Sequence, residues 1–326
     1  MDVLRLTLRQ LQVFVAVARA GSTTAAGEHI ALSQSATSAA INELERLLSL
    51  RLFDRAGKRL LLNDSGRALL PRALALLDGA ADIERIAQDG QARALRLGAS
   101  TTIGNYLLPE LLSRHVQSGP HDGGATWQSK MMIGNTAEVC AAVAGFELDI
   151  GLIEGPCHEP ALDVRPWLRD SLVIVAAPPL ARALAGDAEP GSRIPLRVLR
   201  EQTWLLREVG SGTREATDHA LLSQLRAYHR SIELGSSEAI KRAAAAGLGL
   251  ACLSSWVVEE LLTDGRLVLV PSALPAMGRQ CHIVVHRQKH LTPALRAFID
   301  RAMAYPVDQK EGLLTRALVP ASQQQP

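Results

Sequence analysis

Short hydroxyl and amide side chains recur in the C-terminal two-thirds of this 326-residue chain, at the places where helices are predicted to begin. The first turn of a helix has free backbone amides and a partial positive charge, so it can bind an anion. Hydroxyl and amide groups beside those amides can add hydrogen bonds to an oxyanion. The same residue types are also preferred helix caps, and capping remains the alternative at each single position. The candidate anion-binding residues at these helix starts are Ser100, Thr101, Thr102, Asn135, Thr136, Ser211, Gly212 and Thr213, with Ser236 and Ser237 at a further one.

Charged side chains follow two of these stretches. The segment IEGPCHEP, residues 153–160, comes after a predicted strand and brings Glu154 and His158 to the same end of the sheet. Glu154 could hydrogen-bond a protonated oxyanion or pair with Arg214, and His158 can gain a charge near neutral pH. The alternative is a plain turn set by Gly155 and its following proline. The segment GSGTRE, which contains Arg214, lacks the lysine and following Ser or Thr of a nucleotide-binding P-loop.

An enzyme is the weaker prediction. Cys157 and His158 could serve as nucleophile and base, but adjacent residues seldom reach the required geometry. His282 and His286 share a strand face, whereas His290 lies beyond it and no acidic ligand is spaced with them. We therefore expect no catalytic residue, no metal and no cofactor. A redox switch at Cys157, with Cys140 as a resolving thiol, stays open as an alternative.

Alternating strands and helices must position the candidate anion site. From residue 94 onward the pattern is strand–helix–strand, which predicts an α/β domain with parallel pairing. In open α/β sheets, ligands bind beyond the carboxyl ends of the strands. The order of elements resembles a two-lobed, periplasmic-binding-protein-like sensor domain. We expect lobe one at about 94–170 plus 287–304 and lobe two at about 171–286.

A different use of short polar side chains is predicted near the N-terminus. Apolar spacing indicates helices over 8–20 and 25–30, and a third helix that begins after Ser33. Such a trio matches helix-turn-helix geometry, in which the third helix enters the major groove of DNA by its N-terminal end. Short polar side chains there can reach base edges, and the helix N-terminus can bind a phosphate. The candidate residues are Ser33, Gln34, Ser35, Thr37, Ser38 and Asn42.

A basic hairpin is predicted directly after this trio. Residues 52–66 have a strand–turn–strand pattern with Arg55, Lys58 and Arg59 around the turn. The net charge of the whole chain is only +2, yet residues 51–72 hold six basic and two acidic side chains. A local excess of positive charge favours a polyanion as partner, with a generic protein-interaction domain as the alternative. Aromatic residues are 3% of the chain, too few to favour stacking on single strands.

The segments LRQLQVFVAVARAGSTTAA, LSQSATSAAINELERLLSLRLFDR and NDSGRALLPRA resemble the winged helix-turn-helix of LysR-type transcriptional regulators. The resemblance implies a double-stranded DNA-binding regulator that is not an enzyme. Two departures from the usual pattern of the family occur. Gly27 stands where members usually have alanine, and Ala39 and Ala40 stand where many members carry longer polar or basic side chains on the third helix. No arginine–guanine contact is therefore expected from that helix.

A long helix is expected to follow, at residues 64–90. Its apolar residues recur at helical spacing, and a seam between two subunits would bury them, with packing on its own domain as the alternative. In the family this helix pairs two chains, so the resemblance implies a homodimer or homotetramer that reads a palindromic operator. The expected domains are the all-α winged helix-turn-helix at 1–63, the dimerisation linker helix at 64–90, the effector-binding domain at 94–304 and a tail at 305–326.

Further segments narrow the resemblance. IEGPCH, REVGSGTRE, ELGSSEAIKRAAAAGLGLACLS and HRQKHLTPALRAFID are similar to the YeiE-like subgroup of the family, and the similarity extends to about Ala304. This implies an effector that is a small sulfur oxyanion such as sulfite. The residues themselves leave sulfate, phosphate or an organic acid open. The absence of C-x-x-C spacing, of a signal-peptide core and of an apolar run long enough for a membrane predicts a cytoplasmic protein.

Overall fold

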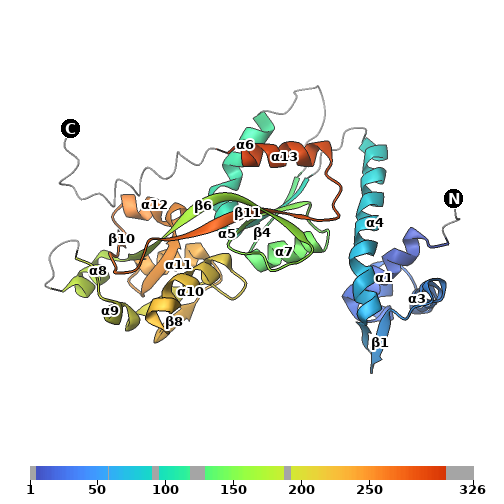
Figure 1. Ribbon diagram of the computed structural model, residues 1–326, viewed down its shortest axis with the longest axis horizontal. Coiled ribbons are helices and arrows are strands. Elements are labelled where there is room, and N and C mark those ends of the chain that lie inside the picture. Colours follow the sequence, from blue (N-terminus) through green and yellow to red (C-terminus); the bar gives the residue numbers. More distant parts are fainter. Residues whose placement is uncertain (1–4, 58, 90–94, 118–128, 187–191, 306–326) are drawn as a thin grey trace. The chain divides into compact units, whose positions relative to one another are not determined.

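The computed structural model describes residues 5–57, 59–89, 95–117, 129–186 and 192–305 (Figure 1). Contacts divide the chain into two compact units, one formed mainly by residues up to 93 and one formed mainly by the residues after them. Each unit has its own buried core, so each is described by itself.

The first unit is a helical bundle with a two-stranded hairpin and a long helix. Its helices start at hydroxyl caps: Ser22 accepts a hydrogen bond from the amide of Ala25, and Ser33 accepts one from Ala36. The left-handed Gly21 ends the first helix. The elements are α1 (Leu8–Ala20), α2 (Thr23–His29), α3 (Gln34–Leu48), β1 (Phe53–Ala56), β2 (Arg59–Leu62) and α4 (Asp64–Asp89).

Helix α4 has two kinds of apolar residue. Ala73 is fully buried in the core of the first unit, and Leu69 and Leu77 pack against that core. Leu76 and Ile83, by contrast, are 56% and 69% exposed. The amphipathic stripe that the sequence predicted is therefore divided between the helix's own domain and solvent.

The second unit is built on one mixed sheet. Its strands are ordered β4-β3-β5-β11-β6-β9-β7-β8, and β10 pairs with β6. Parallel strands occupy both ends of the sheet, whereas the long β6 and β11 pair antiparallel and run side by side through its middle (Figure 1). The strands are β3 (Leu95–Ser100), β4 (Ser129–Gly134), β5 (Ile150–Glu154), β6 (Leu162–Ala176), β7 (Thr203–Leu206), β8 (Arg230–Glu233), β9 (Leu250–Ser254), β10 (Val268–Leu269) and β11 (Met277–His286).

Helices cover this sheet in two groups, which confirms the predicted two-lobed α/β architecture. The helical segment that follows β3 is divided at Leu107, because Pro109 has no amide to donate to the preceding turn. The helices are α5 (Thr101–Tyr106), α6 (Leu108–Gln117), α7 (Thr136–Ala144), α8 (Pro178–Ala185), α9 (Leu196–Arg200), α10 (Gly212–Leu225), α11 (Ser237–Ala245), α12 (Ser255–Thr263) and α13 (Pro293–Met303).

The lobes join through β6 and β11. Cys281, Ile283 and Val285 of β11 pack in the core of the first lobe, with α6 and α13. Along the chain, the return from the second lobe to the first therefore falls inside β11, several residues before the boundary expected at 286. The expected boundary at 170 also falls inside a continuous strand, β6.

Candidate DNA-binding surface and inter-lobe polar site

The first turn of α3 presents short polar side chains to solvent. Ser33, Gln34, Ser35 and Asn42 are exposed, and Ser38 is half-buried. The hydroxyls of Ser33 and Ser35 lie 3.0 Å apart, and the Gln34 amide donates to the Thr23 hydroxyl of α2. This face has the small, hydrogen-bonding character that a recognition helix needs at its N-terminal end.

Thr37 does not belong to that face. Its exposed fraction is 0%, and its hydroxyl donates to the backbone oxygen of Ser33 at 2.9 Å. A side chain on Gly27 would lie 3.1 Å from the Thr37 hydroxyl and 2.6 Å from the backbone oxygen of Leu32. The prediction that Thr37 contacts a base is wrong, because this residue packs α3 closely against α2.

The hairpin of β1 and β2 carries exposed basic side chains. Arg55 lies opposite Leu60, and Arg59 lies opposite Ala56, next to the turn at Gly57. Both arginines are exposed. Lys58 lies outside the described residues. Two guanidinium groups at a hairpin tip can bind phosphates without reading sequence.

In the second unit, the sequence predicted that an anion binds at the start of α5. In the structure, the carboxylate of Glu154 occupies this position. It ends β5 with a side chain 2% exposed. Its Oε1 atom accepts hydrogen bonds from the backbone amides of Thr102 at 2.7 Å and Ile103 at 3.1 Å, at the start of α5. The first turn of α5 is thus already satisfied by a charge of the protein itself. Glu154 does not pair with Arg214, contrary to one of the two predicted roles.

The cation beside Glu154 is Arg279 of β11. Its guanidinium lies 3.2 Å from Glu154 and 2.7 Å from Asp170 of β6. It also donates to the hydroxyls of Thr102 at 3.3 Å and Thr213 at 2.7 Å. One buried arginine therefore connects α5 of the first lobe with α10 of the second.

Backbone contacts close the same region. The Ser100 hydroxyl accepts from the amide of Glu154, and the Thr136 hydroxyl donates to its carbonyl at 2.9 Å. Thr136 also accepts from the amide of Gly212 at 3.2 Å. A β-carbon on Gly212 would lie 1.8 Å from the Glu154 carbonyl, so only glycine allows this approach. We call Glu154, Arg279, Asp170 and the groups that bond to them the inner network.

A second cluster surrounds Arg207, which follows β7 and has a side chain 2% exposed. Its guanidinium donates to Ser237 of α11 at 3.0 Å and to Thr101 of α5 at 3.5 Å. Its remaining edge makes two 2.7 Å bonds to the carboxylate of Glu208. Burial raises the pKa of Glu208, but hydrogen bonds from Arg207, from its own amide and from Asn135 outweigh burial, so the pKa lies below its ordinary value. We call Arg207, Glu208, Thr101, Asn135 and Ser237 the outer cluster.

Three other predicted residues contribute no side chain to either group. Ser211 caps α10 by accepting from the amide of Arg214. Arg214 pairs with Asp218 at 2.7 Å and Glu233 at 3.3 Å. His158 is exposed and pairs with Glu215 at 3.0 Å.

The sequence predicted the hydroxyls but missed the charges that they contact. Arg207, Glu208, Asp170 and Arg279 were not among the predicted residues. Arg207 and Glu208 directly follow a buried strand, which is a usable signal, because charges at such a position face the ligand edge of an α/β sheet. Arg279 has no comparable signal, since its partners are 109 and 125 residues away in the chain.

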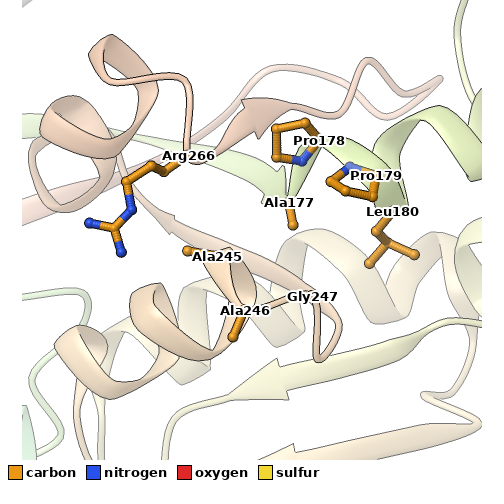
Figure 2. Close-up of a pocket in the computed structure, with 8 residues that line it drawn as sticks. All are labelled: Ala177, Pro178, Pro179, Leu180, Ala245, Ala246, Gly247 and Arg266. Carbon is orange, nitrogen blue, oxygen red and sulfur yellow. The ribbon is translucent and has the colours of Figure 1, made fainter.

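A surface hollow of about 630 Å³ lies elsewhere, in the second lobe. Figure 2 shows Arg266 as the charged side chain in a lining that is otherwise alanine, proline, leucine and glycine. Such a surface offers few hydrogen bonds to a small oxyanion, so it does not compete with the polar groups between the lobes.

The alternative chemistries have less support in the described residues. No group of three His, Cys, Asp or Glu there could hold a metal ion. His282 contacts the carbonyl of Gly155, and Cys140 Sγ lies 3.5 Å from Cys157 Sγ. Burial and the neighbouring Cys157 raise the pKa of Cys140 well above its ordinary value. None of the described helices is apolar over the length that a bilayer requires.

Two protein families match consecutive parts of the chain. Residues 8–67 match the family described as "Bacterial regulatory helix-turn-helix protein, lysR family", and residues 88–305 match "LysR substrate binding domain". The chain is a LysR-type transcriptional regulator. This confirms the expected family and the expectation that the chain is not an enzyme, and it assigns the regulator to the cytoplasm, where bacterial DNA is.

Known proteins resemble the regulator along most of its length. It is 47% identical over 299 residues to the HTH-type transcriptional regulator YeiE of Escherichia coli strain K12, which covers 91% of this chain and 97% of that one. It is 34% identical to the HTH-type transcriptional regulator CysL of Bacillus subtilis, over 80% of this chain and 84% of that one. A full-length OxyR variant from Pseudomonas aeruginosa shares the fold, with a TM-score of 0.63, 23% identity and coverage of 92% and 95%.

Proposed function

We propose that this DNA-binding regulator senses a small sulfur oxyanion such as sulfite, which binds between the two lobes of its C-terminal domain. In this proposal the operator is palindromic and the regulator binds it as a homodimer or homotetramer. The bases, or the DNA backbone beside them, are contacted by the polar residues at the start of α3, namely Ser33, Gln34, Ser35, Ser38 and Asn42. The hairpin residues Arg55, Lys58 and Arg59 contact phosphates.

One observation supports the position of the effector above all others. Hydrogen bonds join the two lobes at helix N-termini: the amide of Gly212 in α10 donates to the Thr136 hydroxyl of α7, and Arg207, after β7, donates to the Thr101 hydroxyl of α5. A ligand at such a junction contacts both lobes at once. If the ligand binds one arrangement of the lobes more tightly than another, it therefore increases the population of that arrangement.

The outer cluster is the better position for the effector. The inner network is filled by Glu154 and Arg279, whose side chains are each 2% exposed. Thr101 and Asn135 of the outer cluster lie beside a partly exposed carboxylate. We propose that effector binding there changes lobe closure, and that closure changes the spacing of the two DNA-binding domains in the oligomer.

Calorimetric titration of the full chain with sulfite, sulfate, phosphate and acetate tests the proposal. We expect sulfite to bind most tightly, and Thr101→Val to weaken its binding about tenfold, because the hydroxyl that positions Arg207 is lost, at ~1.4 kcal/mol. Operator affinity without anion should not change. Thr263→Val is the control, since that hydroxyl is exposed and bonds only to Glu259 of its own helix. Equal binding of sulfite by all three proteins would contradict the assignment.

A redox switch is a second candidate, supported by the 3.5 Å separation of Cys140 and Cys157. A peroxide would oxidise the Cys157 thiolate, forming an S–O bond as the O–O bond breaks and releasing water or alcohol. The Cys140 thiol would then lose its proton and form the S–S bond as the S–O bond breaks, so that the second oxygen leaves with this proton as water. Mass spectrometry should show one Cys140–Cys157 disulfide after hydrogen peroxide treatment. Its absence would eliminate this candidate.

A further inference from the structure

We propose that Glu208 is a built-in competitor of the effector: its carboxylate occupies the anion position on Arg207, and an effector must displace it to bind. The inference rests on the proposed function and names the groups that set affinity and selectivity at that site. The chemical class it selects is a compact oxyanion of higher charge than a carboxylate.

The geometry of Arg207 divides its guanidinium into a fixed part and an exchangeable part. Nη1 donates to the Ser237 hydroxyl at 3.0 Å, and Nη2 lies 3.5 Å from the Thr101 hydroxyl. These two hydroxyls come from helices α11 and α5, so they hold the side chain in place. The edge formed by Nε and Nη2 faces both oxygens of Glu208, at 2.7 Å each. This is the bidentate arrangement in which an arginine binds a carboxylate or another planar pair of oxygens.

Glu208 can leave this position with little loss to the fold. It is the residue next to Arg207 in the chain and follows the end of β7, and its side chain is 25% exposed. Rotation of the side chain can move the carboxylate to solvent without moving a helix or strand. Glu154 is different, because it is 2% exposed and accepts from two amides of α5. Of these two carboxylates, Glu208 is therefore the exchangeable one.

The departure of Glu208 would leave a site prepared for an anion. The Nε and Nη2 groups of Arg207 would lose the carboxylate while the side chain stays buried, although Nη2 would keep its 3.5 Å contact with the Thr101 hydroxyl. A buried cation without a counter-charge is costly. Asn135 is oriented there as well: its carbonyl oxygen accepts from the amide of Glu138, which leaves its side-chain nitrogen to donate to Glu208. Three side-chain N–H donors would thus meet the incoming anion.

Competition by a tethered group also gives selectivity. A carboxylate attached beside its binding partner has an effective concentration on the order of millimolar or more. A free monocarboxylate offers the same two oxygens and the same single charge, so it gains nothing that offsets this concentration. A sulfite dianion carries more charge and a third oxygen, which can accept from Asn135 while the other two accept from Arg207.

The test compares the full-length parent with Glu208→Gln by calorimetric titration with sulfite and with acetate. The glutamine keeps the size of the side chain but lacks the charge, so we expect sulfite to bind at least tenfold more tightly and acetate binding to become measurable. Glu208→Ala should show the same direction. Arg207→Gln should lose sulfite binding. Glu215→Gln is the matched control, because it removes a carboxylate that pairs with the exposed His158.

The outcomes separate this inference from the proposed function. If the parent binds sulfite and Glu208→Gln binds it no more tightly, the effector assignment stands and the competitor role is overturned. If Glu208→Gln binds sulfite while the parent shows no binding, the competitor role is supported in its strongest form. If neither protein binds sulfite, the proposed effector and the competitor role both fail.

Discussion

Arg279 illustrates what residue types in a sequence do and do not predict. Helix-start rules identified Thr102 and Thr213 as groups that face a charge, and both hydroxyls accept hydrogen bonds. The charge is Arg279, and it reaches them because β11 pairs with both β5 and β6. Periodicity and capping are local properties of a segment, whereas this pairing joins residues more than a hundred positions apart. The polar lining was therefore predictable, and its internal ions were not.

Replacing Arg279 should destabilise the C-terminal domain severely. Arg279→Met removes one cation from two buried carboxylates, Glu154 and Asp170, and leaves their charges uncompensated. Breaking a buried pair in this way costs about 3–5 kcal/mol. Urea denaturation followed by circular dichroism should show the loss as a lower midpoint. Arg182→Met, at an exposed position of α8, is the control and should leave the midpoint nearly unchanged.

Secondary-structure elements were predicted best where several local patterns agreed. The helices of the first unit and the hairpin of β1 and β2 form at the predicted places, because caps, glycine and apolar spacing agree there. The apolar run at 172–176, which is typical of a strand, lies in the second half of the longer β6. Its first half, from Leu162 to Arg169, mixes charged residues and a proline with apolar ones, so alternation does not reveal it.

The hairpin provides a prediction that concerns an element as a whole. If β1 and β2 form a wing that binds phosphates, Arg55→Gln and Arg59→Gln should each weaken DNA binding on every sequence. The slope of log affinity against log salt should become shallower by about 0.9 for each lost phosphate contact. Fluorescence anisotropy at several salt concentrations measures both effects. Arg182→Gln removes the same charge from the other unit and should keep the parent's slope, and equal slopes in all the variants would refute the wing.

At the scale of the whole molecule, α4 has to serve two purposes. Part of its apolar stripe completes the core of the DNA-binding unit through Ala73, Leu69 and Leu77. Leu76 and Ile83 are left exposed, and they lie seven residues apart, which puts them on one face of the helix. Exposed apolar residues at heptad spacing fit a seam with a second copy of the helix. Helical periodicity in the sequence predicts one continuous apolar stripe. Only the packing in the structure shows that part of the stripe is buried in the domain core and part is exposed.

The oligomer can be tested on this face. Leu76→Glu combined with Ile83→Glu places charges in the proposed seam, so the variant should fall to the mass of a monomer in sedimentation velocity or light scattering. Its affinity for a palindromic operator should fall to that for a half-site, because two linked domains gain from effective concentration and a single one does not. Arg72→Glu introduces the same side chain at an exposed position of the same helix and should keep the parent's mass. A double variant with the parent's mass would show that these residues do not join the subunits, and the surface that brings two DNA-binding units to one operator would then lie outside this face of α4.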